Sequence, residues 1–592
     1  SFELSIHHHD RFTIHLASCQ TLRRRVRKNE YSLSFGYHNR IMTVATLIGH
    51  AITAAVAILL TSGIWLTIYF VGVKPASKGG DTYNIYGNCS TSGDAPSSSC
   101  TPPPPVTCEK TCEFVICESI PAGLVFNSSY PIYNSTTSCW MRLMIEFITP
   151  FYIFSLFQHS IHYTSLPRAL HKKTSNKAPL AVNRRCEEIS YEATSDILIG
   201  SYYWSLLVQD TGSNYTVDPS GTSADGELIY STILQTAQRG VKVRIAQTYQ
   251  DGGYPETTNL AANSNGNLEV RSLDFTQWYP GGILHTKSWA VDGKHFYVGS
   301  ANFDWRALTQ VKELGMAVFN CPCLAQDFTK LLDIYWDMGA PGAKIPQSWP
   351  DYYATSSYHE RPTSVPQPSG SQAVYFSAAP PGFQSCGRES DIDAMVKLID
   401  EAQERLDMAV MDYAPCTLYL KPLNSWYGRL DEAIRRAAFD RQVKVRFMHS
   451  RWSHTNARAY AYMHSLQDIS SQLQCLYQGG KCVRRGSIEV RFIQVPEMQY
   501  GNIPFSRVYH NKYFVTEKAV YVGTSNWTPD YWKYTAGIGM VIRADDSSQK
   551  SVIVDQFAKI FERDWNSDYT IPLSYFDNNG KWTNGSSTSS PL

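Results

Sequence analysis

Two stretches of the chain carry the same reactive side chains at nearly the same intervals. The first is "HTKSWAVDGKHFYVGSAN" (His285–Asn302), and the second is "HNKYFVTEKAVYVGTSN" (His510–Asn526). Side chains at positions i and i+2 of a strand share a face, so each histidine should project together with the lysine two residues later. Imidazole can serve as a nucleophile or a proton donor, and lysine can hold an anion.

The remaining residues of each motif suggest how such a site is completed. The small and amide residues that should end the next strand of a hairpin are Gly299, Ser300 and Asn302 in the first motif, and Gly523, Thr524, Ser525 and Asn526 in the second. There, glycine lets the backbone approach a ligand, and the hydroxyl and amide groups can donate hydrogen bonds. Asp292 and Glu517 lie five positions beyond the lysines, and we expect these carboxylates to orient the imidazoles and fix their tautomers.

Brought together about a pseudo-twofold axis, the two motifs would form a receptor for a phosphodiester. Lys287, Lys512 and the two asparagines would hold the non-bridging oxygens and stabilise charge in the transition state. One imidazole would attack phosphorus while the other protonates the leaving oxygen. Neither motif has the carboxylate cluster of a two-metal site, so we expect no metal and no other cofactor. A single His near a Lys is usually an ordinary residue, but recurrence in the same register argues against coincidence.

The motifs belong to a longer internal repeat. "RGVKVRIA" (Arg239–Ala246) recurs as "RQVKVRFM" (Arg441–Met448), and "LEVRSLD" (Leu268–Asp274) recurs as "IEVRFIQ" (Ile488–Gln494). Each half alternates apolar strands with amphipathic helices and closes on a helix. This order predicts an α/β fold of two duplicated lobes, each a mixed sheet flanked by helices, related by a pseudo-twofold axis.

Composition divides the rest of the chain. The expected segments are a cytosolic N-terminal segment (1–41), a transmembrane signal anchor (42–73), a luminal Ser-, Pro- and Gly-rich stalk (74–107), a first lobe (108–355) with an insertion at about 146–185, a linker (356–381), a second lobe (382–570) and a C-terminal tail (571–592). The insertion is interpreted as a surface loop or a retained intron, because it has no period and its apolar part is too short to span a bilayer.

The anchor is predicted from residues 42–73, which contain no Asp, Glu, Lys or Arg. This length can cross a bilayer, and the basic residues at 23–28 should hold the N-terminus in the cytosol, giving a single-pass type II protein. A cleaved signal peptide is the alternative. The first methionine is Met42, so whether residues 1–41 are an artefact of gene prediction stays open.

Charge and cysteine content limit the compartment and the partners. The formal net charge is +1, so any site for a polyanion must be local rather than a global basic field. Fourteen cysteines without paired CxxC spacing, together with several N-x-[ST] sequons, favour an oxidising and glycosylating compartment. The glycosylation candidates are Asn88, Asn127, Asn134, Asn214 and Asn584. Asn526 also lies in a sequon, but we expect it to be unmodified because it should line the phosphate pocket.

At this point the motifs resemble a known family. The first matches HxKx4Dx6GSxN of the phospholipase D superfamily, whereas the second has Glu517 for Asp and one residue fewer before its glycine. The text around them, including "VKELG", is similar to the endolysosomal phospholipase-D-like 5′ exonucleases, the third and fourth mammalian members. This resemblance runs from Cys108 to about Asp564, outside the insertion. It implies metal-independent 5′→3′ digestion of single-stranded DNA and RNA in acidic lysosomes, through a phosphohistidine intermediate.

The resemblance also implies roles for individual residues. His285 becomes the nucleophile and His510 the general acid, although a near-symmetric pair leaves that order open. The phosphate ligands become Lys287, Lys512, Asn302 and Asn526, with Asp292 and Glu517 as orienting carboxylates and Ser300, Ser525 and Glu313 as supporting residues. Glu313 would support His510 from the opposite motif. Disulfides are implied between the pair Cys108 and Cys112 and the pair Cys321 and Cys323; Cys475 and Cys482 could close a small loop, and Cys386 has no obvious partner.

Several questions stay open at this level. A lipid-acting enzyme of the same fold, either a phospholipid or lysophospholipid transphosphatidylase or a phospholipase D, would present the same phosphodiester to the same pocket. A catalytically inert, membrane-anchored binding protein is the third alternative. The aromatic residues near the motifs are candidates for base stacking, although most should be core: Tyr202, Tyr203, Trp204, Phe303, Trp305, Trp527, Tyr531 and Trp532.

The expected location follows from the anchor and the resemblance together. It is the membrane of the endoplasmic reticulum, Golgi and endolysosome, with the catalytic part in the lumen. Release of a soluble lysosomal form is left open, as is the formation of a homodimer.

Overall fold

The computed structural model of the protein describes residues 100–109, 112–144, 193–211, 221–497, 503–546 and 549–583. The expected cytosolic segment, anchor and insertion lie outside these residues, as do the sequons at Asn88, Asn214 and Asn584. Among the described helices, none combines the length and the apolar character that a bilayer crossing requires.

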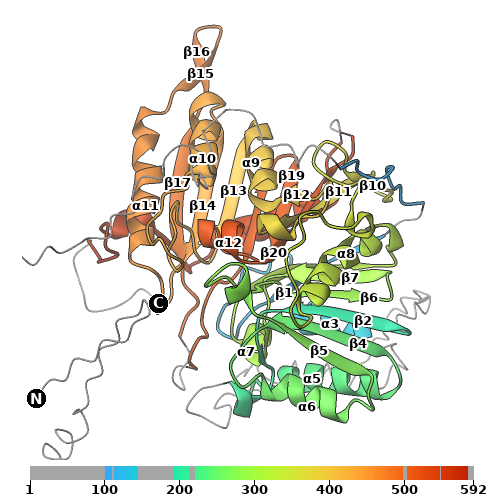
Figure 1. Ribbon diagram of the computed structural model, residues 1–592. Coiled ribbons are helices and arrows are strands. Elements are labelled where there is room, and N and C mark those ends of the chain that lie inside the picture. The colour runs from blue at the N-terminus through green and yellow to red at the C-terminus, as the bar shows by residue number, and fades with distance from the viewer. Residues whose placement is uncertain are drawn as a thin grey trace, which may run out of the picture. The chain divides into compact units, whose positions relative to one another are not determined.

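The first lobe is built on a seven-stranded mixed sheet (Figure 1). Its strands, in spatial order, are β1 (Glu113–Ser119), β9 (Glu313–Phe319), β7 (His295–Gly299), β6 (Ser288–Val291), β2 (Asp196–Ser201), β4 (Lys242–Thr248) and β5 (Leu268–Leu273). The strands β2, β4 and β5 run parallel, and the other neighbours pair antiparallel. The repeated segments predicted as strands are therefore neighbours in this sheet.

The second lobe repeats this sheet strand for strand. The matching order is β11 (Gln372–Ala379), β20 (Gly537–Ala544), β19 (Ala519–Gly523), β18 (Lys512–Thr516), β13 (Arg405–Val410), β14 (Lys444–Ser450) and β17 (Ser487–Ile493). Each neighbouring pair has the same direction as its counterpart in the first lobe. Three short strands extend the sheet: β10 (Thr363–Val365), β12 (Glu389–Ser390) and β21 (Thr570–Pro572). The predicted duplication is confirmed.

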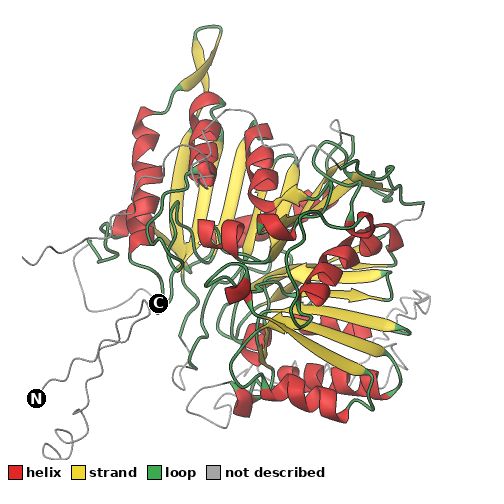
Figure 2. Cartoon of the chain, viewed as in Figure 1, coloured by secondary structure: helices red, strands yellow, loops and turns green. Residues whose placement is uncertain are grey.

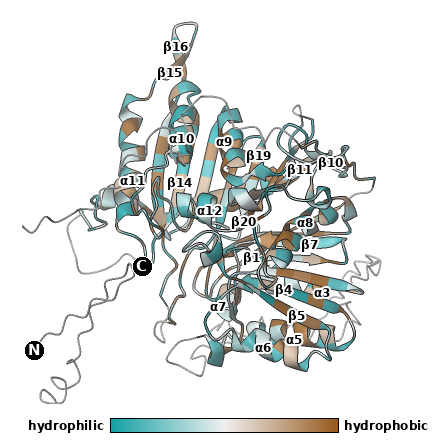
Figure 3. Cartoon of the chain, in the orientation of Figure 1, coloured by the Kyte–Doolittle hydropathy of each residue, from teal (hydrophilic) through white to brown (hydrophobic). Residues whose placement is uncertain are grey.

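Helices cover both faces of each sheet (Figure 2). One face of the first sheet packs with α3 (Thr136–Met144), α5 (Ala224–Gln238) and α6 (Pro255–Asn263). One face of the second packs with α9 (Asp391–Glu401), α10 (Arg429–Asp440) and α11 (Arg458–Gln467). The opposite faces share a single core with α8 (Pro322–Met338) and α13 (Val552–Trp565), in which the rings of Phe296 and Phe376 lie 5.4 Å apart. This shared core fixes one lobe against the other. Figure 3 shows that hydrophobic residues are concentrated on the strands of the first sheet.

The smaller elements lie around these layers. They are β3 (Trp204–Ser205), β8 (Phe303–Asp304), α7 (Trp305–Thr309), α12 (Pro529–Tyr534) and the hairpin of β15 (Cys475–Gln478) and β16 (Lys481–Arg485).

Three expected boundaries are wrong. Residues 356–381 are no linker, because they include β10 and β11, and all eight residues of β11 are buried inside the second sheet. The second lobe also continues past 570, since Ile571, Leu573 and Phe576 belong to its core. At the other end, Cys100 is disulfide-bonded to Cys386, so the stalk stops before this cysteine.

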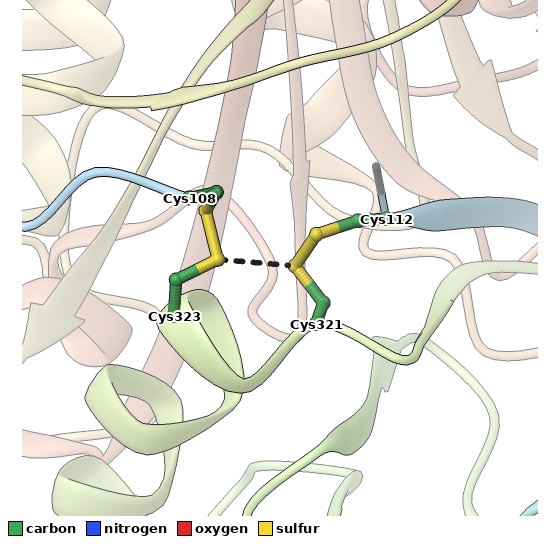
Figure 4. A group of neighbouring side chains, drawn as sticks. All are labelled: Cys108, Cys112, Cys321 and Cys323. Carbon is green, nitrogen blue, oxygen red and sulfur yellow. Dashed lines mark hydrogen bonds between the residues drawn. A yellow bond between two sulfur atoms is a disulfide. The ribbon is translucent and has the colours of Figure 1, made fainter. Parts of the chain in front are cut away.

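Five disulfides link the described residues. Cys108–Cys323, Cys112–Cys321 and Cys475–Cys482 confirm the predicted pairs, whereas Cys100–Cys386 and Cys117–Cys139 were not foreseen. The first two lie side by side, with 3.7 Å between the Sγ atoms of Cys321 and Cys323 (Figure 4). Together they fasten the strand β1 to the start of α8. Disulfides on this scale indicate a luminal or extracellular location.

Candidate active site

The two motifs meet where the backbones of the lobes join. Leu284 forms a parallel bridge with Ala536, and Tyr509 forms the same bridge with Lys312. As a result, the amide of His285 donates to the carbonyl of Ala536 at 2.8 Å, and the amide of His510 donates to that of Lys312 at 2.8 Å. Each histidine is therefore positioned by the other lobe, about the predicted pseudo-twofold axis.

A cavity of about 330 Å³ lies at this junction, and both histidines line it. Asn302, Glu313 and Asn526 line the same cavity. Sequence reasoning thus selected five residues that the fold brings to one place from separate segments.

Lys287 and Lys512 are fully buried next to their histidines. The Nζ atom of Lys287 donates to the carbonyl of His285 at 2.6 Å, and that of Lys512 donates to the carbonyl of His510 at 2.8 Å. Burial, reinforced by the charge of Lys512, holds the pKa of Lys287 well below its ordinary value. Burial also lowers the pKa of Lys512 to about 7, against the opposing pull of Glu313 and Asp412. Two crowded ammonium groups in a dry site favour an anionic ligand.

The two imidazoles have different partners at Nδ1. The Nδ1 atom of His510 lies 2.9 Å from both carboxylate oxygens of Glu313, which confirms the predicted contact. The Nδ1 atom of His285 lies 3.0 Å from the backbone carbonyl of Thr524. A carbonyl can only accept a hydrogen bond, so Nδ1 of His285 must carry hydrogen, and in the neutral imidazole the lone pair is then on Nε2.

The charge environment of the two imidazoles differs as well. Burial and the charges of Lys287 and Lys512 hold the pKa of His285 well below the usual range. Burial also lowers the pKa of His510, but the carboxylate of Glu313 works against that shift. In the second lobe, Gly537 begins β20 where Glu313 begins β9, so His285 has no carboxylate in the matching place.

The prediction that Asp292 and Glu517 orient the imidazoles is wrong. Asp292 lies in the turn between β6 and β7, where it and Gly293 both have positive φ, as a type I′ turn requires. Its carboxylate accepts from the backbone amides of residues 194–196 at 2.7–2.9 Å, at the start of β2. Glu517 binds the amides of residues 403–405 in the same manner. The seven positions from each histidine to its carboxylate span roughly 23 Å of extended chain, which puts these carboxylates at the far end from the histidines.

The two serines predicted to support the site do not occupy equivalent positions in the two lobes. Ser300 Oγ donates to the carbonyl of Leu314 at 3.1 Å and accepts from its amide at 2.9 Å, which ties the motif to β9 beside Glu313. In the second lobe, Thr524 Oγ1 accepts from the amide of Ile538 at 3.0 Å. Thr524 is thus the counterpart of Ser300, and the supporting role of Ser525 stays a prediction.

Sequence reasoning missed Asp412, which follows β13 and is buried. Its Oδ2 accepts from Tyr419 at 3.2 Å and from Nδ2 of Asn526 at 3.4 Å. Burial raises the pKa of Asp412 to about 6, against the charge of Lys512. The available signal was a carboxylate directly after a repeated strand, in "LDMAVMDYA", where the first lobe has "DILIGSYYW".

Most of the aromatic candidates belong to the core. Trp204, Phe303, Trp305, Trp527 and Trp532 are at most 3% exposed. Tyr202, Tyr203 and Tyr531 line the cavity, and the rings of Tyr202 and Tyr531 each lie 5.0 Å from the imidazole of His285. Trp452 and Phe505 also line it, although neither belongs to a repeated motif.

A buried ionic chain lies beside His510. Lys312 contacts Glu118 at 3.2 Å, Glu118 contacts Arg563 at 2.8 Å, and Arg563 contacts Asp564 at 2.9 Å. Tyr509 donates to Asp564 at 2.7 Å, which closes the chain next to the histidine. Burial opposes ionisation of Glu118, but the charges of Lys312 and Arg563 outweigh it and hold its pKa at about 2.

The sequons within the described residues differ in the exposure of their asparagine side chains. Asn127 and Asn134 are exposed, so a glycan has room at either. Asn526 is 1% exposed, as its expected role in the pocket requires.

Comparisons with known proteins agree with this architecture. A family model described as the PLD-like domain of PLD3 and PLD4 matches residues 206–492. A Xenopus laevis protein named 5'-3' exonuclease PLD3 is 34% identical over 471 residues, which cover 79% of this chain and 83% of that protein. The Homo sapiens protein of that name is 34% identical over 79% of this chain and 82% of its own length, and the Mus musculus 5'-3' exonuclease PLD4 is 33% identical over 78% and 80%. This chain therefore belongs to the PLD3/PLD4 family of phospholipase D-like proteins.

Proposed function

We propose that the protein is a phosphodiester hydrolase that removes nucleotides from the 5′ end of single-stranded DNA or RNA. The relatives named above are 5'-3' exonucleases, and the pocket of this chain supports the same chemistry. One observation carries the proposal: two imidazoles with unlike Nδ1 partners line one cavity next to two buried lysines.

The first step is attack by His285 on the scissile phosphorus. Its Nε2 lone pair forms the P–N bond while the bond from phosphorus to the leaving oxygen breaks. His510 gives the proton on its Nε2 to that oxygen, and Glu313 stabilises the imidazolium from the other side of the ring. Lys287, Lys512, Asn302 and Asn526 hold the non-bridging oxygens, so the pocket supplies its own positive charge and we expect no metal requirement.

The second step releases the phosphohistidine. A water oxygen attacks phosphorus and gives a proton to Nε2 of His510, which is now the base. The P–N bond breaks, and its electron pair returns to His285.

The unequal pKa shifts suit an acidic compartment. An ordinary imidazole is largely protonated below its usual pKa of 6.5, which would remove the nucleophile. Burial and both lysines hold the pKa of His285 well below that value, which favours the neutral, nucleophilic form. His510 has Glu313 to favour its charged form, and a bound phosphate anion adds to that effect.

The location inside the cell forms part of the proposal. We place the catalytic lobes in the endolysosomal lumen, attached through an anchor at residues 42–73. Protease protection and carbonate extraction of membranes test this attachment, and light scattering tests whether the protein forms a homodimer.

The decisive experiment uses the full chain in an acidic buffer with EDTA. Single-stranded oligonucleotides with a free 5′-hydroxyl and a label at the 3′ end should shorten stepwise from the 5′ end. His285→Ala and His510→Ala should abolish this shortening, whereas His464→Ala, a change in a histidine on α11 outside the pocket, should not. Intact oligonucleotides, or cleavage that survives both pocket changes, would overturn the proposed function; head-group exchange on a lysophospholipid would then identify the substrate as lipid.

A further inference from the structure

Three aromatic rings stand in a row on loops at one side of the catalytic cavity. Trp452 and His454 follow β14, and their rings lie 4.7 Å apart. The rings of His454 and Phe505 lie 5.0 Å apart and are stacked, with 24° between their planes. Phe505 sits five residues before His510 in a separate loop, so the row is assembled by tertiary packing.

The row is continuous with the active site. Trp452 and Phe505 line the same cavity as His285 and His510. The Phe505 side chain is 60% exposed, whereas most large apolar side chains near the site are buried. An exposed phenylalanine next to a reactive centre offers its ring to a ligand rather than to the core.

The described segment that carries Phe505, from Ile503 onward, is firmly held. Phe505 has a φ of +56°, a left-handed conformation that phenylalanine rarely adopts. On one side of it, the carbonyl of Pro504 accepts from Arg306 at 2.8 Å, and on the other Ser506 donates to the carbonyl of Ile503 at 2.7 Å. Ile503 itself is buried against Val208 and Trp305. The exposure of the ring is thus imposed by the fold, and strained backbone near a site points to function.

A second cavity, of about 440 Å³, lies on the other side of Trp452. Trp452 belongs to both cavities. The second is lined mainly by polar side chains, which include Arg451, Arg507, Gln494 and one carboxylate, Glu497. A lipid would require apolar walls at this place for its acyl chain. Aromatic rings followed by cationic side chains match instead the alternating bases and phosphates of single-stranded nucleic acid.

We propose that Trp452, His454 and Phe505 form a stacking platform for a nucleobase next to the scissile phosphate. This inference rests on the proposed function and extends it to how the strand is held. Every base has a flat π-face, so the platform accepts all four bases and gives little sequence selectivity. It also places the following phosphate toward the arginine-lined second cavity.

The test combines abasic substrates with variants of the full chain. A series of 3′-labelled oligonucleotides carries one abasic residue at successive positions from the 5′ end. With the wild-type protein, one position should lower kcat/KM by about tenfold, mainly through KM, because a stacked base has been removed. Phe505→Ala should show a similar loss on the unmodified oligonucleotide and no further loss from that abasic position.

Controls separate the platform from general damage. Phe505→Leu keeps apolar volume without a ring and should behave like Phe505→Ala, and Trp452→Leu should lower kcat/KM in the same direction. Phe439→Ala removes another exposed phenylalanine, on α10 outside the cavity, and should keep the wild-type abasic profile. Thermal melts confirm that each variant is folded.

The possible outcomes separate this inference from the proposed function on which it rests. Equal wild-type rates at every abasic position, or a full abasic penalty in Phe505→Ala, would overturn the platform and leave the exonuclease intact. No digestion of any unmodified oligonucleotide would overturn the proposed function, and the platform with it.

Discussion

Glu313 of the first lobe accepts the Nδ1 hydrogen of His510 in the second lobe, whereas the matching position opposite His285 is Gly537. The duplication therefore preserves the frame of the site but not its electrostatics. A carboxylate supports the charged form of one imidazole. Burial and two lysines support the neutral form of the other, against the opposing effect of its hydrogen bond to the Thr524 carbonyl. This asymmetry supports our proposal that His510 is the acid and His285 the nucleophile.

The Glu313–His510 contact predicts how pH dependence should change. In Glu313→Gln, the attraction that favours imidazolium is lost, so the pKa of His510 should fall further. The alkaline limb of the kcat/KM profile should then move to lower pH, with kcat reduced about tenfold to a hundredfold. Steady-state profiles on a labelled oligonucleotide measure both. A uniform loss of rate without movement of the limb would show that Glu313 acts only on packing.

The order of the two histidines is testable with the leaving group. A thymidine phosphodiester that releases p-nitrophenolate needs little help from an acid. On this substrate His510→Ala should keep at least about a tenth of the wild-type first turnover and accumulate a phosphoenzyme, because the second step lacks its base. His285→Ala should give neither product nor phosphoenzyme.

A quench in alkaline denaturant, which preserves the acid-labile P–N bond, followed by mass spectrometry should locate the phosphoryl group on His285 in the His510→Ala protein. The opposite pattern, with accumulation on His510 in His285→Ala, would reverse the assignment.

The repeat predicted the architecture because strand and helix patterns are local. Arg239–Ala246 and Arg441–Met448 became β4 and β14, which are neighbours of β2 and β13 in the two sheets. The strand β11 was not predicted because Pro and Ser dominate the sequence around Ser356–Pro381. A strand buried on both sides lacks the alternation that marks a half-exposed one.

The contacts within the site were harder to predict, because distance along the sequence does not match distance in the fold for several of its residues. Asp292 was assigned to the histidine by its place in the motif, yet the strand between them carries it to the other end of β6. Phe505 and Trp452 lie on loops outside the repeated sequence segments. Only the packing of the two lobes brings them to the cavity.

The buried lysines should lower the stability of the free protein. The pKa of Lys512 is about 7 in the folded state against an ordinary value of 10.5, so the unfolded state binds the extra proton. Stability is then lost as the pH falls from above 10.5 through 7, and the full cost remains at acidic pH. Lys512→Met should raise the unfolding free energy there by about 1 to 3 kcal/mol while abolishing activity.

Inorganic phosphate offers the complementary measurement. An anion between the ammonium groups should raise the melting temperature of the wild-type protein in acid, and Lys512→Met should lose that shift. Equal melting temperatures for both proteins, with and without phosphate, would contradict a charged, anion-seeking pocket.

Asp292 should matter for stability and hardly at all for chemistry. Its carboxylate accepts hydrogen bonds from three backbone amides and from the hydroxyls of Thr194 and Ser195. These bonds fasten the β6–β7 turn to the start of β2. Asp292→Ala should therefore lower the unfolding free energy by about 2 to 3 kcal/mol, because several charge-assisted hydrogen bonds are lost together. Per folded molecule, kcat should stay within about threefold of wild type, since the His285 tautomer is set by Thr524. Denaturant unfolding and active-site titration separate the two quantities, with Glu517→Ala as the matched change in the second lobe. A drop in kcat by about a hundredfold at unchanged stability would restore Asp292 as a positioning residue for the imidazole.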